Sequence, residues 1–276
     1  MLDFSLCTLR KSRPSHNHHT LKPGTYSNGR FFTDGYSRPM QADSWARVQG
    51  WWADLFGCGK DQLWQGLSVT KHVGLTGYEG ILVAHRSTGC HVSLPSWVNA
   101  RTRESLSQQG MSRITDPDFW MQLPETAALS VIGPSVHSYT DGASWTAPTK
   151  SATDAVIEAP RDQLEGLRFA MDPADWGEGG FADGASRFFA LRVAGEVVAA
   201  ANLTEFLDGP ADIGVVVHPE FRGRGLGLAV AAAATSYALE EVGVARWRAR
   251  VTNAPSRAMA AALGFEDYCH QMAIRA

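Results

Sequence analysis

A β-branched run that leads through a glycine-rich turn into an apolar helix constrains this chain more than any other feature. Val215, Val216 and Val217 favour an extended strand. Glycines then stand at alternate positions, and the apolar sequence from Gly225 to Val242 predicts a long helix. Glycine permits positive φ angles and lets a ligand approach the backbone closely. The segment therefore predicts a strand, a tight turn and a helix in immediate succession.

An anion-binding site is expected where the turn meets the helix. Successive N–H groups in such a turn form a concave nest. The N-terminus of the helix adds about half a positive charge. Strand, glycine loop and helix N-terminus together suit a phosphate group, and a pyrophosphate in particular. A glycine-rich turn that merely caps a helix is the alternative that needs no ligand.

Three phosphate-binding patterns can be compared with the residues present. A Walker loop ends in lysine followed by serine or threonine, and this loop contains no lysine. The dinucleotide fingerprint needs two residues between its second and third glycines, whereas one residue separates Gly225 from Gly227. In the third pattern, Gln or Arg is followed at fixed spacing by Gly and then by Gly or Ala. Arg222, Gly225 and Gly227 fit it, and the segment thereby resembles the pyrophosphate loop of the GNAT superfamily of acetyl-CoA-dependent N-acetyltransferases.

The resemblance extends over residues 187–276. The His-Pro step at His218 follows the valine strand as in the family's fourth strand and loop. Asn253, a short helix and the Leu-Gly-Phe triplet at 263–265 are similar to the next family motif. The resemblance implies an α/β, or α+β, fold with a mixed, mostly antiparallel sheet flanked by helices. The predicted element order agrees, because three hairpin-linked strands precede helix, strand, helix and strand.

Roles in binding acetyl-CoA follow from this resemblance. The backbone amides of the loop would bind the pyrophosphate, and the edge of the valine strand would pair with the pantetheine arm like an added strand. The N–H of Val217 would polarise the thioester carbonyl and hold the developing oxyanion. The implied cofactor-binding residues are Val215, Val216, Val217, Arg222, Gly223, Arg224, Gly225, Leu226, Gly227, Asn253 and Ser256.

The residues that transfer protons are left open by the pattern. The attacking amine must lose a proton, and a carboxylate is a usual acceptor. Glu205, late in the second predicted strand, and Asp212, early in the third, are candidates for the general base, and Glu178 is a weaker one. At the position of Ala260, many family members carry a tyrosine, and this tyrosine protonates the leaving thiolate. Here Ser256 or water acts instead, or the thiolate leaves unassisted.

We therefore expect acetyl transfer from acetyl-CoA to a primary amine by direct attack, without a covalent enzyme intermediate. Because the tyrosine is missing, a protein that binds acetyl-CoA without catalysis is the alternative. The acceptor is left open between a peptide and a small molecule: acidic grooves favour cationic peptides, whereas a pocket around Trp176 and Phe181 favours small molecules. A net charge of −3 argues against nucleic acid as a partner. The cysteine spacing fits no zinc site, and no metal is expected.

Two domains are the expectation for 276 residues. Residues 151–276 carry 11 arginines against 17 acidic residues, a net charge of −6, whereas the first 150 residues carry +3. With residues 140–152 interpreted as a linker, this step separates an α+β domain (43–145) from the GNAT-type domain (150–276). One hypothesis makes the first domain a second, degenerate GNAT-like half, which requires a V-shaped opening between two parallel strands.

Residues 1–42, rich in Ser, Pro, Gly and His, predict an extended arm. The polar N-terminus and the absence of a long apolar run favour a cytoplasmic protein without a membrane partner. The four scattered cysteines indicate free thiols. Trp51, Trp52, Trp64 and Trp97 are interpreted as core residues, with a binding site as the alternative.

The periodicity of apolar residues also predicts the individual elements. Residues 172–184, rich in Asp and Gly, predict a loop. Helices are expected at 44–56, 95–106, 162–171, 225–242 and 255–263, and strands at 67–72, 80–85, 91–94, 187–193, 196–206, 212–217, 246–251 and 265–274.

Overall fold

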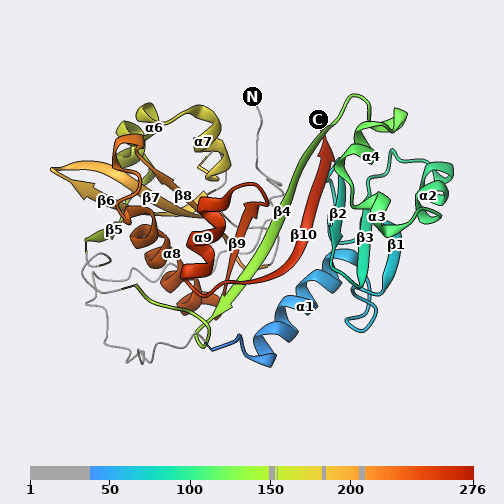
Figure 1. The fold of residues 1–276 in the computed structure, drawn as a ribbon, viewed down its shortest axis with the longest axis horizontal. Coiled ribbons are helices and arrows are strands. Elements are labelled where there is room, and N and C mark those ends of the chain that lie inside the picture. The colour runs from blue at the N-terminus through green and yellow to red at the C-terminus, as the bar shows by residue number, and fades with distance from the viewer. Residues whose placement is uncertain (1–37, 149–152, 154, 182–184, 205–208) are drawn as a thin grey trace.

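One mixed sheet of ten strands runs through the described part of the molecule (Figure 1). The computed structural model describes residues 38–148, 153, 155–181, 185–204 and 209–276. The strand order is β1-β3-β2-β10-β4-β9-β8-β7-β6-β5. β1 pairs with β3, and β8 with β9, in parallel, whereas the other neighbours pair antiparallel. The mixed, mostly antiparallel sheet expected from the sequence is thus confirmed.

The elements have the following bounds. The strands are β1 (Gly66–Lys71), β2 (Ile81–His85), β3 (Gly89–Leu94), β4 (Ser130–Asp141), β5 (Val156–Glu158), β6 (Ala185–Val193), β7 (Glu196–Thr204), β8 (Asp212–Val217), β9 (Val244–Arg250) and β10 (Glu266–Arg275). The α-helices are α1 (Ala42–Phe56), α2 (Ala100–Ser107), α3 (Met111–Ile114), α4 (Pro117–Met121), α6 (Glu165–Ala170), α7 (Pro173–Glu178), α8 (Leu226–Val242) and α9 (Ala254–Ala262). Short 3-10 helices occupy Pro124–Thr126, Arg161–Leu164 and Pro219–Phe221.

Helix α7 lies in the stretch 172–184 that the sequence predicts as a loop. The side chain of Asp172 caps the helix by accepting a hydrogen bond from the N–H of Ala174 at 2.7 Å. Pro173 occupies the first turn, where its fixed φ suits a helix and its missing N–H costs nothing. Two strong start signals therefore outweigh the glycines that follow, and the loop prediction is wrong for residues 173–178.

Strand β4 is the element that the sequence conceals best. Its last residues, Thr140 and Asp141, fall inside the stretch predicted as a linker. The strand has little apolar alternation, since His137, Ser138 and Thr140 are buried polar residues. They are accommodated because side chains of neighbouring segments bind them: His137 binds Gln271 through Nε2, Ser138 donates to Asp267, and Thr140 binds Ser144. The linker prediction is therefore wrong for residues 140 and 141.

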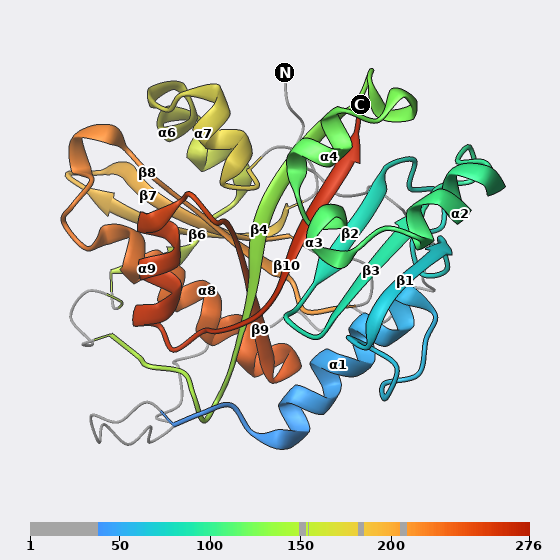
Figure 2. The ribbon, with the colours of Figure 1, turned by 45° about the vertical axis from the view of Figure 1, so that its right-hand side comes forward.

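Strands β4 and β10 join the two halves of the chain. β10 pairs with β2 on one side and with β4 on the other, and β4 in turn pairs with β9. Figures 1 and 2 show the two long strands side by side, with β1–β3 and α1–α4 on one side of them and β5–β8 on the other. The boundary predicted near residue 150 therefore does not coincide with a break in the sheet.

The parallel pair in the N-terminal half lacks the opening that a degenerate GNAT-like half requires. β1 and β3 pair in continuous register from Gly66–Gly89 to Lys71–Leu94. Residues 1–37 of the predicted arm lie outside the described residues, as do residues 149–152 of the linker. Within residues 38–148 the structure thus shows one parallel pair, without divergence, which argues against the hypothesis of a second GNAT-like half.

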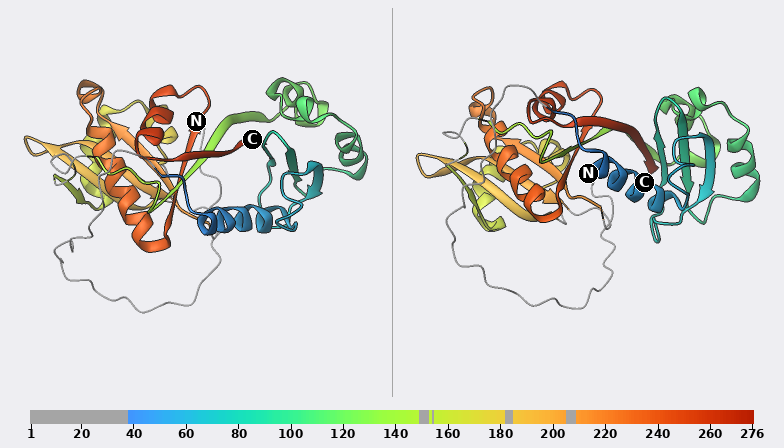
Figure 3. Two further views of the ribbon diagram at one scale, coloured as in Figure 1. Left: turned by 60° about the horizontal axis from the view of Figure 1, so that its bottom comes forward. Right: turned by 90° about the horizontal axis from the view of Figure 1, so that it is seen from below.

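Helices cover both faces of the sheet. α8 and α9 pack on one face around Trp247 and the alanines of β7. Arg246, the neighbour of Trp247, points to the opposite face, where its guanidinium lies 5.1 Å from the ring of Trp51 in α1. Figure 3 shows α1 running beneath the joining strands. Trp52 and Trp64 are buried in the core around α1, as predicted, whereas Trp97 is exposed. No helix in the described segments is long and apolar enough to span a bilayer.

The position of β4 predicts that the C-terminal half does not fold alone. Residues 150–276 without β4 would leave the facing edges of β9 and β10 unpaired in the middle of the sheet. We expect this fragment to lack a cooperative thermal unfolding transition by circular dichroism. Addition of a fragment covering residues 38–148 is expected to restore the transition. Native-like cooperative unfolding of residues 150–276 by themselves would contradict the structure.

Candidate functional site

The parallel pairing of β8 and β9 is short. Its register covers Asp212 opposite Arg246 and Ile213 opposite Trp247. Past these two pairs the strands diverge. A cavity opens between them, and residues of both β8 and β9 line it. β8 keeps its other neighbour throughout, since it pairs with β7 along its whole length. One edge of β8 therefore faces the cavity with its backbone groups.

The register of β7 and β8 determines which backbone groups face the cavity. The N–H of His218 donates to the carbonyl of Val198 at 2.8 Å, and Val216 lies opposite Ala200. In an antiparallel pair, alternate residues bond to the partner strand and the residues between them point away. The N–H groups of Val215 and Val217 consequently point into the opening beside β9.

The glycine loop, residues 222–227, lies at the wide end of this opening. Gly223 and Gly225 have φ angles of 75° and 76°, which only glycine adopts without strain. Gly225 is the N-cap of α8, and no side chain of the described residues caps that helix. The first N–H groups of a helix have no partners within it. With Gly225, Leu226 and Gly227 lining the cavity, this end of α8 presents backbone donors to it.

Arg222 fixes the loop to its surroundings. Its Nε donates to the carbonyl oxygen of Val217 at 3.2 Å, and its terminal nitrogen binds the carboxylate of Asp175 in α7 at 2.8 Å. Arg224 points elsewhere, because it donates to the carbonyl of Glu220 and stacks on Phe221. Arg222 thus ties the end of β8 to α7, whereas Arg224 stabilises the turn itself.

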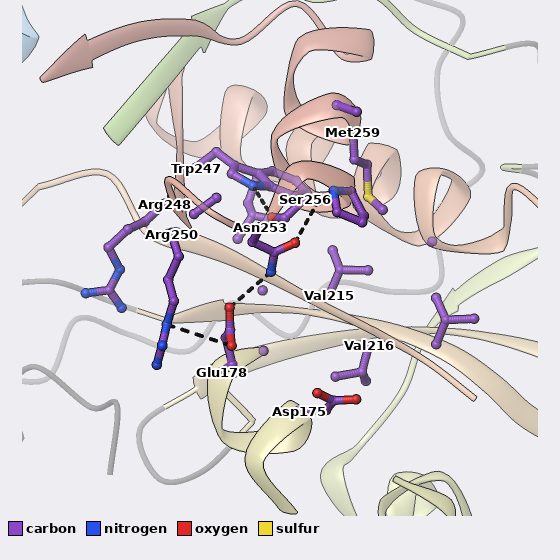
Figure 4. A pocket seen from close by; sticks show the side chains of 18 of the residues that line it. Asp175, Glu178, Val215, Val216, Trp247, Arg248, Arg250, Asn253, Ser256 and Met259 are labelled. Carbon is purple, nitrogen blue, oxygen red and sulfur yellow. Dashed lines mark hydrogen bonds and ion pairs between the residues drawn. The ribbon is translucent and has the colours of Figure 1, made fainter. Parts of the chain in front are cut away.

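The second wall of the opening is the N-terminus of α9 (Figure 4). Asn253 caps this helix, since its Oδ1 accepts from the N–H of Ser256 at 3.1 Å. The Oγ of Ser256 accepts from Nε1 of Trp247 at 3.0 Å. A hydroxyl that accepts one hydrogen bond still has its own proton to donate. Ser256 lines the cavity and can therefore donate into it.

Glu178 connects the two walls. It ends α7 on the β8 side, yet its Oε1 accepts from Nδ2 of Asn253 at 3.0 Å and its Oε2 lies 3.8 Å from Arg250 on β9 (Figure 4). The placement depends on Gly214, where a Cβ would overlap the carbonyl oxygen of Gly179. The missing side chain lets the end of α7 lie directly against β8. A carboxylate is thereby held at the opening.

Asp212 lies where β8 and β9 meet. Its Oδ1 binds Nε of Arg246 at 2.6 Å, and its Oδ2 lies 3.6 Å from Nε of Arg248. Burial by itself would raise the pKa of Asp212, but the two guanidinium groups outweigh burial and hold the pKa below its ordinary value. A carboxylate so stabilised in its charged form is a weak base. This arrangement argues for a structural role and against the general-base role that the sequence left open.

A polar floor borders the opening on the face opposite α8 and α9. Ser135 of β4 and Gln271 of β10 lie opposite each other, and Ser135 also lies opposite Arg250. His137 binds Oε1 of Gln271 through Nε2 at 3.0 Å. Burial, followed by the charge of Arg246, lowers the pKa of His137 to about 3, so the imidazole is neutral at pH 7. Since Oε1 only accepts, Nε2 of His137 carries the proton.

These features surround one cavity of about 840 Å³. This volume is within the range of ligand pockets in proteins. Its lining includes ten of the residues predicted from the sequence: Val215, Val216, Val217, Arg222, Gly223, Gly225, Leu226, Gly227, Asn253 and Ser256.

The remaining predicted residues lie elsewhere. Arg224 and Asp212 do not line the cavity, and Glu205 falls outside the described residues. Ala260 of α9 is buried in the core that α8 and α9 share. Trp176 and Phe181, proposed as an aromatic pocket, pack against each other in the core around α6 and α7. The structure therefore brings the strand, the loop and the start of α9 together and leaves the aromatic pair aside.

Sequence reasoning missed the polar side of the cavity. Arg246, Arg248 and Arg250 alternate with apolar residues in a predicted strand, which places all three on one face. This pattern was available as a signal. No sequence signal marked Ser135 and Gln271 as cavity residues, because their positions depend on where β4 and β10 pair. Within the described ranges no group of three or more His, Cys, Asp or Glu side chains could hold a metal ion.

Comparisons with known proteins identify the matching segment. Residues 153–265 match the model of the acetyltransferase (GNAT) family. A GNAT-family protein from Novosphingobium aromaticivorans is 20% identical, with 53% of this chain and 66% of that chain covered and a TM-score of 0.43. This chain thus spans just under two thirds of that protein. No curated protein matches the sequence.

Two further solved structures resemble parts of the chain. A GCN5-related N-acetyltransferase-like protein from Streptococcus suis is 15% identical, covers 83% of this chain and 98% of its own length, and gives a TM-score of 0.46. An aminoglycoside N-acetyltransferase solved in complex with CoA is 22% identical, covers 40% of this chain and 90% of its own length, and gives a TM-score of 0.31.

Replacement of Asp212 tests its structural role. Asp212→Asn leaves the fully buried Arg246 without its counter-charge, so we expect a loss of about 3 kcal/mol in the free energy of unfolding. The exposed pair of Arg187 with Glu158 provides the control, because Glu158→Gln should cost less than about 1 kcal/mol. Urea denaturation at pH 7 measures both. Equal effects of the two substitutions would contradict the structural role.

The stabilisation by Asp212 also depends on pH. Its folded-state pKa lies below the ordinary value of 3.8, so its contribution is complete above that value and is lost as the pH falls through the folded-state pKa. The difference in stability between the wild type and Asp212→Asn should therefore be constant near neutrality and shrink below about pH 4. A difference that grows on acidification would contradict this assignment.

Proposed function

Because residues 153–265 belong to the GNAT family of acetyltransferases, we propose that this protein transfers an acetyl group from acetyl-CoA to a primary amine by direct attack. The observation that carries the proposal is the free edge of β8, which lies beside the uncapped N-terminus of α8 in one cavity. An extended arm with a pyrophosphate at one end matches this combination of a strand edge and a helix N-terminus.

Binding of acetyl-CoA would use backbone groups almost entirely. The pyrophosphate would lie at the start of α8, against the N–H groups of the glycine loop. The pantetheine arm would follow the edge of β8, where the N–H groups of Val215 and Val217 point toward it. Asn253 and Ser256 would border the arm from the α9 side. The divergence of β9 provides the space.

Val217 is proposed as the oxyanion donor. Its N–H shares a peptide plane with the carbonyl of Val216, which pairs with Ala200 of β7, so the ladder aims the N–H at the opening. Attack of the amine on the thioester carbonyl places negative charge on the carbonyl oxygen. A backbone donor that is already oriented stabilises this charge by about 3 kcal/mol.

Glu178 is proposed as the general base. The amine nitrogen forms the new bond to the acetyl carbon while the bond to sulfur breaks, and the nitrogen must release a proton. Glu178 lines the cavity and is held at the opening by Asn253, whereas Asp212 is engaged by two arginines. A base so positioned contributes about 100-fold or more to the rate.

Ser256 is proposed to assist the leaving thiolate. Its hydroxyl accepts from Trp247, so its own proton is available to the sulfur atom that leaves. Ala260 is buried in the core, and its methyl side chain cannot donate a proton to the thiolate. A hydrogen bond from Ser256 would stabilise the thiolate, which water can then protonate. The alternative function, acetyl-CoA binding without catalysis, predicts no release of thiol with any amine.

The cofactor assignment is tested at Gly225. Gly225→Asp places a negative charge at the start of α8, so acetyl-CoA should bind about 100-fold more weakly, or by about 2.7 kcal/mol. Isothermal titration calorimetry measures this effect. Gly195→Asp is the matched control, because both glycines have positive φ, at 76° and 92°, and open space around the missing side chain. Loss of binding in both variants, or in neither, would count against the site.

The roles in catalysis are tested at Glu178 and Ser256. Glu178→Gln keeps an oxygen that can accept from Asn253 but cannot take up a proton, so kcat should fall about 100-fold. Ser256→Ala should lower kcat about tenfold, in proportion to one lost hydrogen bond to a charged group. The affinity for acetyl-CoA should change little in Glu178→Gln. Glu165→Gln on α6 is the control, and unchanged kcat in Glu178→Gln would reject this residue as the base.

A further inference from the structure

The cavity is positively charged although its half of the chain is acidic. Its lining contains four arginines and two acidic residues. Arg222 binds Asp175 near the glycine loop, and Glu178 lies near Arg250. Arg248 and Arg250 of β9 place positive charge on the side of the cavity that β9, β4 and β10 line. An acceptor whose only charge is an ammonium group would be repelled there.

The positive end is built on one face of the sheet. Arg248 and Arg250 stand two residues apart on β9, so their side chains leave the same face and both line the cavity. Arg248 shares the carboxylate of Asp212 with Arg246, and that carboxylate is 1.0 Å closer to Arg246, at 2.6 Å against 3.6 Å. One carboxylate thus serves two guanidinium groups. Arg275 of β10 lines the far end.

The floor between these arginines offers further donors. Gln271 uses its carbonyl oxygen to accept from His137, so the two N–H bonds of its amide group are left to serve other partners. Gln271 and Ser135 both line the cavity beside Arg250. Guanidinium, amide and hydroxyl donors that converge on one space suit the two oxygens of a carboxylate.

We propose that the acceptor is a small amino-acid-like zwitterion, whose carboxylate binds Arg248 and Arg250 above Gln271 while its amine faces Glu178 and the N–H of Val217. This inference rests on the proposed acetyl transfer and adds the class of acceptor to it. The arginine pair and the carboxylate of Glu178 match the two opposite charges of such a molecule. The ammonium group loses one proton to water and becomes a nucleophilic amine, Glu178 takes the second proton as the C–N bond forms, and the carboxylate fixes the orientation for attack.

Matched pairs of amines test the inference. Common α-amino acids, β-alanine and γ-aminobutyrate are each compared with their primary carboxamides at saturating acetyl-CoA, and thiol release is followed. At least one acid should be acetylated with a kcat/KM about tenfold or more above that of its amide. Where no turnover is seen, N-acetylated acids and amides are compared at up to about 10 mM by their effect on the melting temperature of the CoA-saturated protein.

Arginine variants then locate the carboxylate. Arg248→Gln and Arg250→Gln should each lower the ratio of kcat/KM for the acid to kcat/KM for its amide about tenfold, mainly by raising KM for the acid. The Kd of acetyl-CoA should stay unchanged, and melting temperatures establish that both variants fold. Arg192→Gln is the control, because this exposed arginine on β6 binds Gly195 and Gln163 away from the cavity.

The outcomes separate the two proposals. Two results in a protein that binds acetyl-CoA would overturn the inference and leave the cofactor assignment intact. In the first, amides are acetylated as well as the corresponding acids; in the second, neither the acids nor the N-acetylated acids are recognised. Insensitivity of the acid to both arginine variants would also overturn it. Failure of the wild type to bind acetyl-CoA would reject the proposed function and this inference with it.

Discussion

Asp212 binds a fully buried guanidinium at the first of the two residue pairs that join β8 to β9. Breaking a buried ion pair by removing one partner is costly, because the remaining charge is stranded away from water. The pair therefore fixes where two neighbouring parallel strands meet. Everything beyond that point is free to diverge, and the free edge of β8, the start of α9 and the glycine loop take their positions from it.

The divergence creates a cavity with two chemically different ends. On the side of α8 and α9 the donors are backbone N–H groups and the hydroxyl of Ser256, beside apolar residues such as Met259 and Leu226. On the other face the donors are side chains of β9, β4 and β10. Glu178 stands between them, with its carboxylate held by Asn253 and near Arg250. A proton acceptor thus lies at the border between the two ends.

The local parts of this structure follow from the sequence. β8 has the predicted bounds, and α8 begins one residue after the predicted start, because β-branched residues, glycines and an apolar run specify their own conformations. The loop residues and the residues on either side of the opening were predicted from the resemblance to the GNAT superfamily. The helix α7 was missed although Asp172 and Pro173 carry its start signal.

Long-range pairing could not be predicted in this way. β4 lies between β9 and β10, and its partners are more than a hundred residues away in the chain, as in the pairing of Val136 with Ala249. No pattern within β4 encodes that choice. The role of Asp212 was likewise hidden, since its basicity depends on Arg246 and Arg248, which are brought to it by the fold. The role of Glu205 as a general base stays a prediction.

The insertion of β4 has a consequence for how the molecule forms during its synthesis. Residues of β4 are synthesised before both of its partner strands, which lie more than a hundred residues further along the chain. Contacts so distant along the chain slow folding, because long loops must close before any pairing is gained. The nascent chain therefore carries an unpaired central strand while the residues between β4 and β9 are added, which exposes it to aggregation and makes it a candidate client of chaperones.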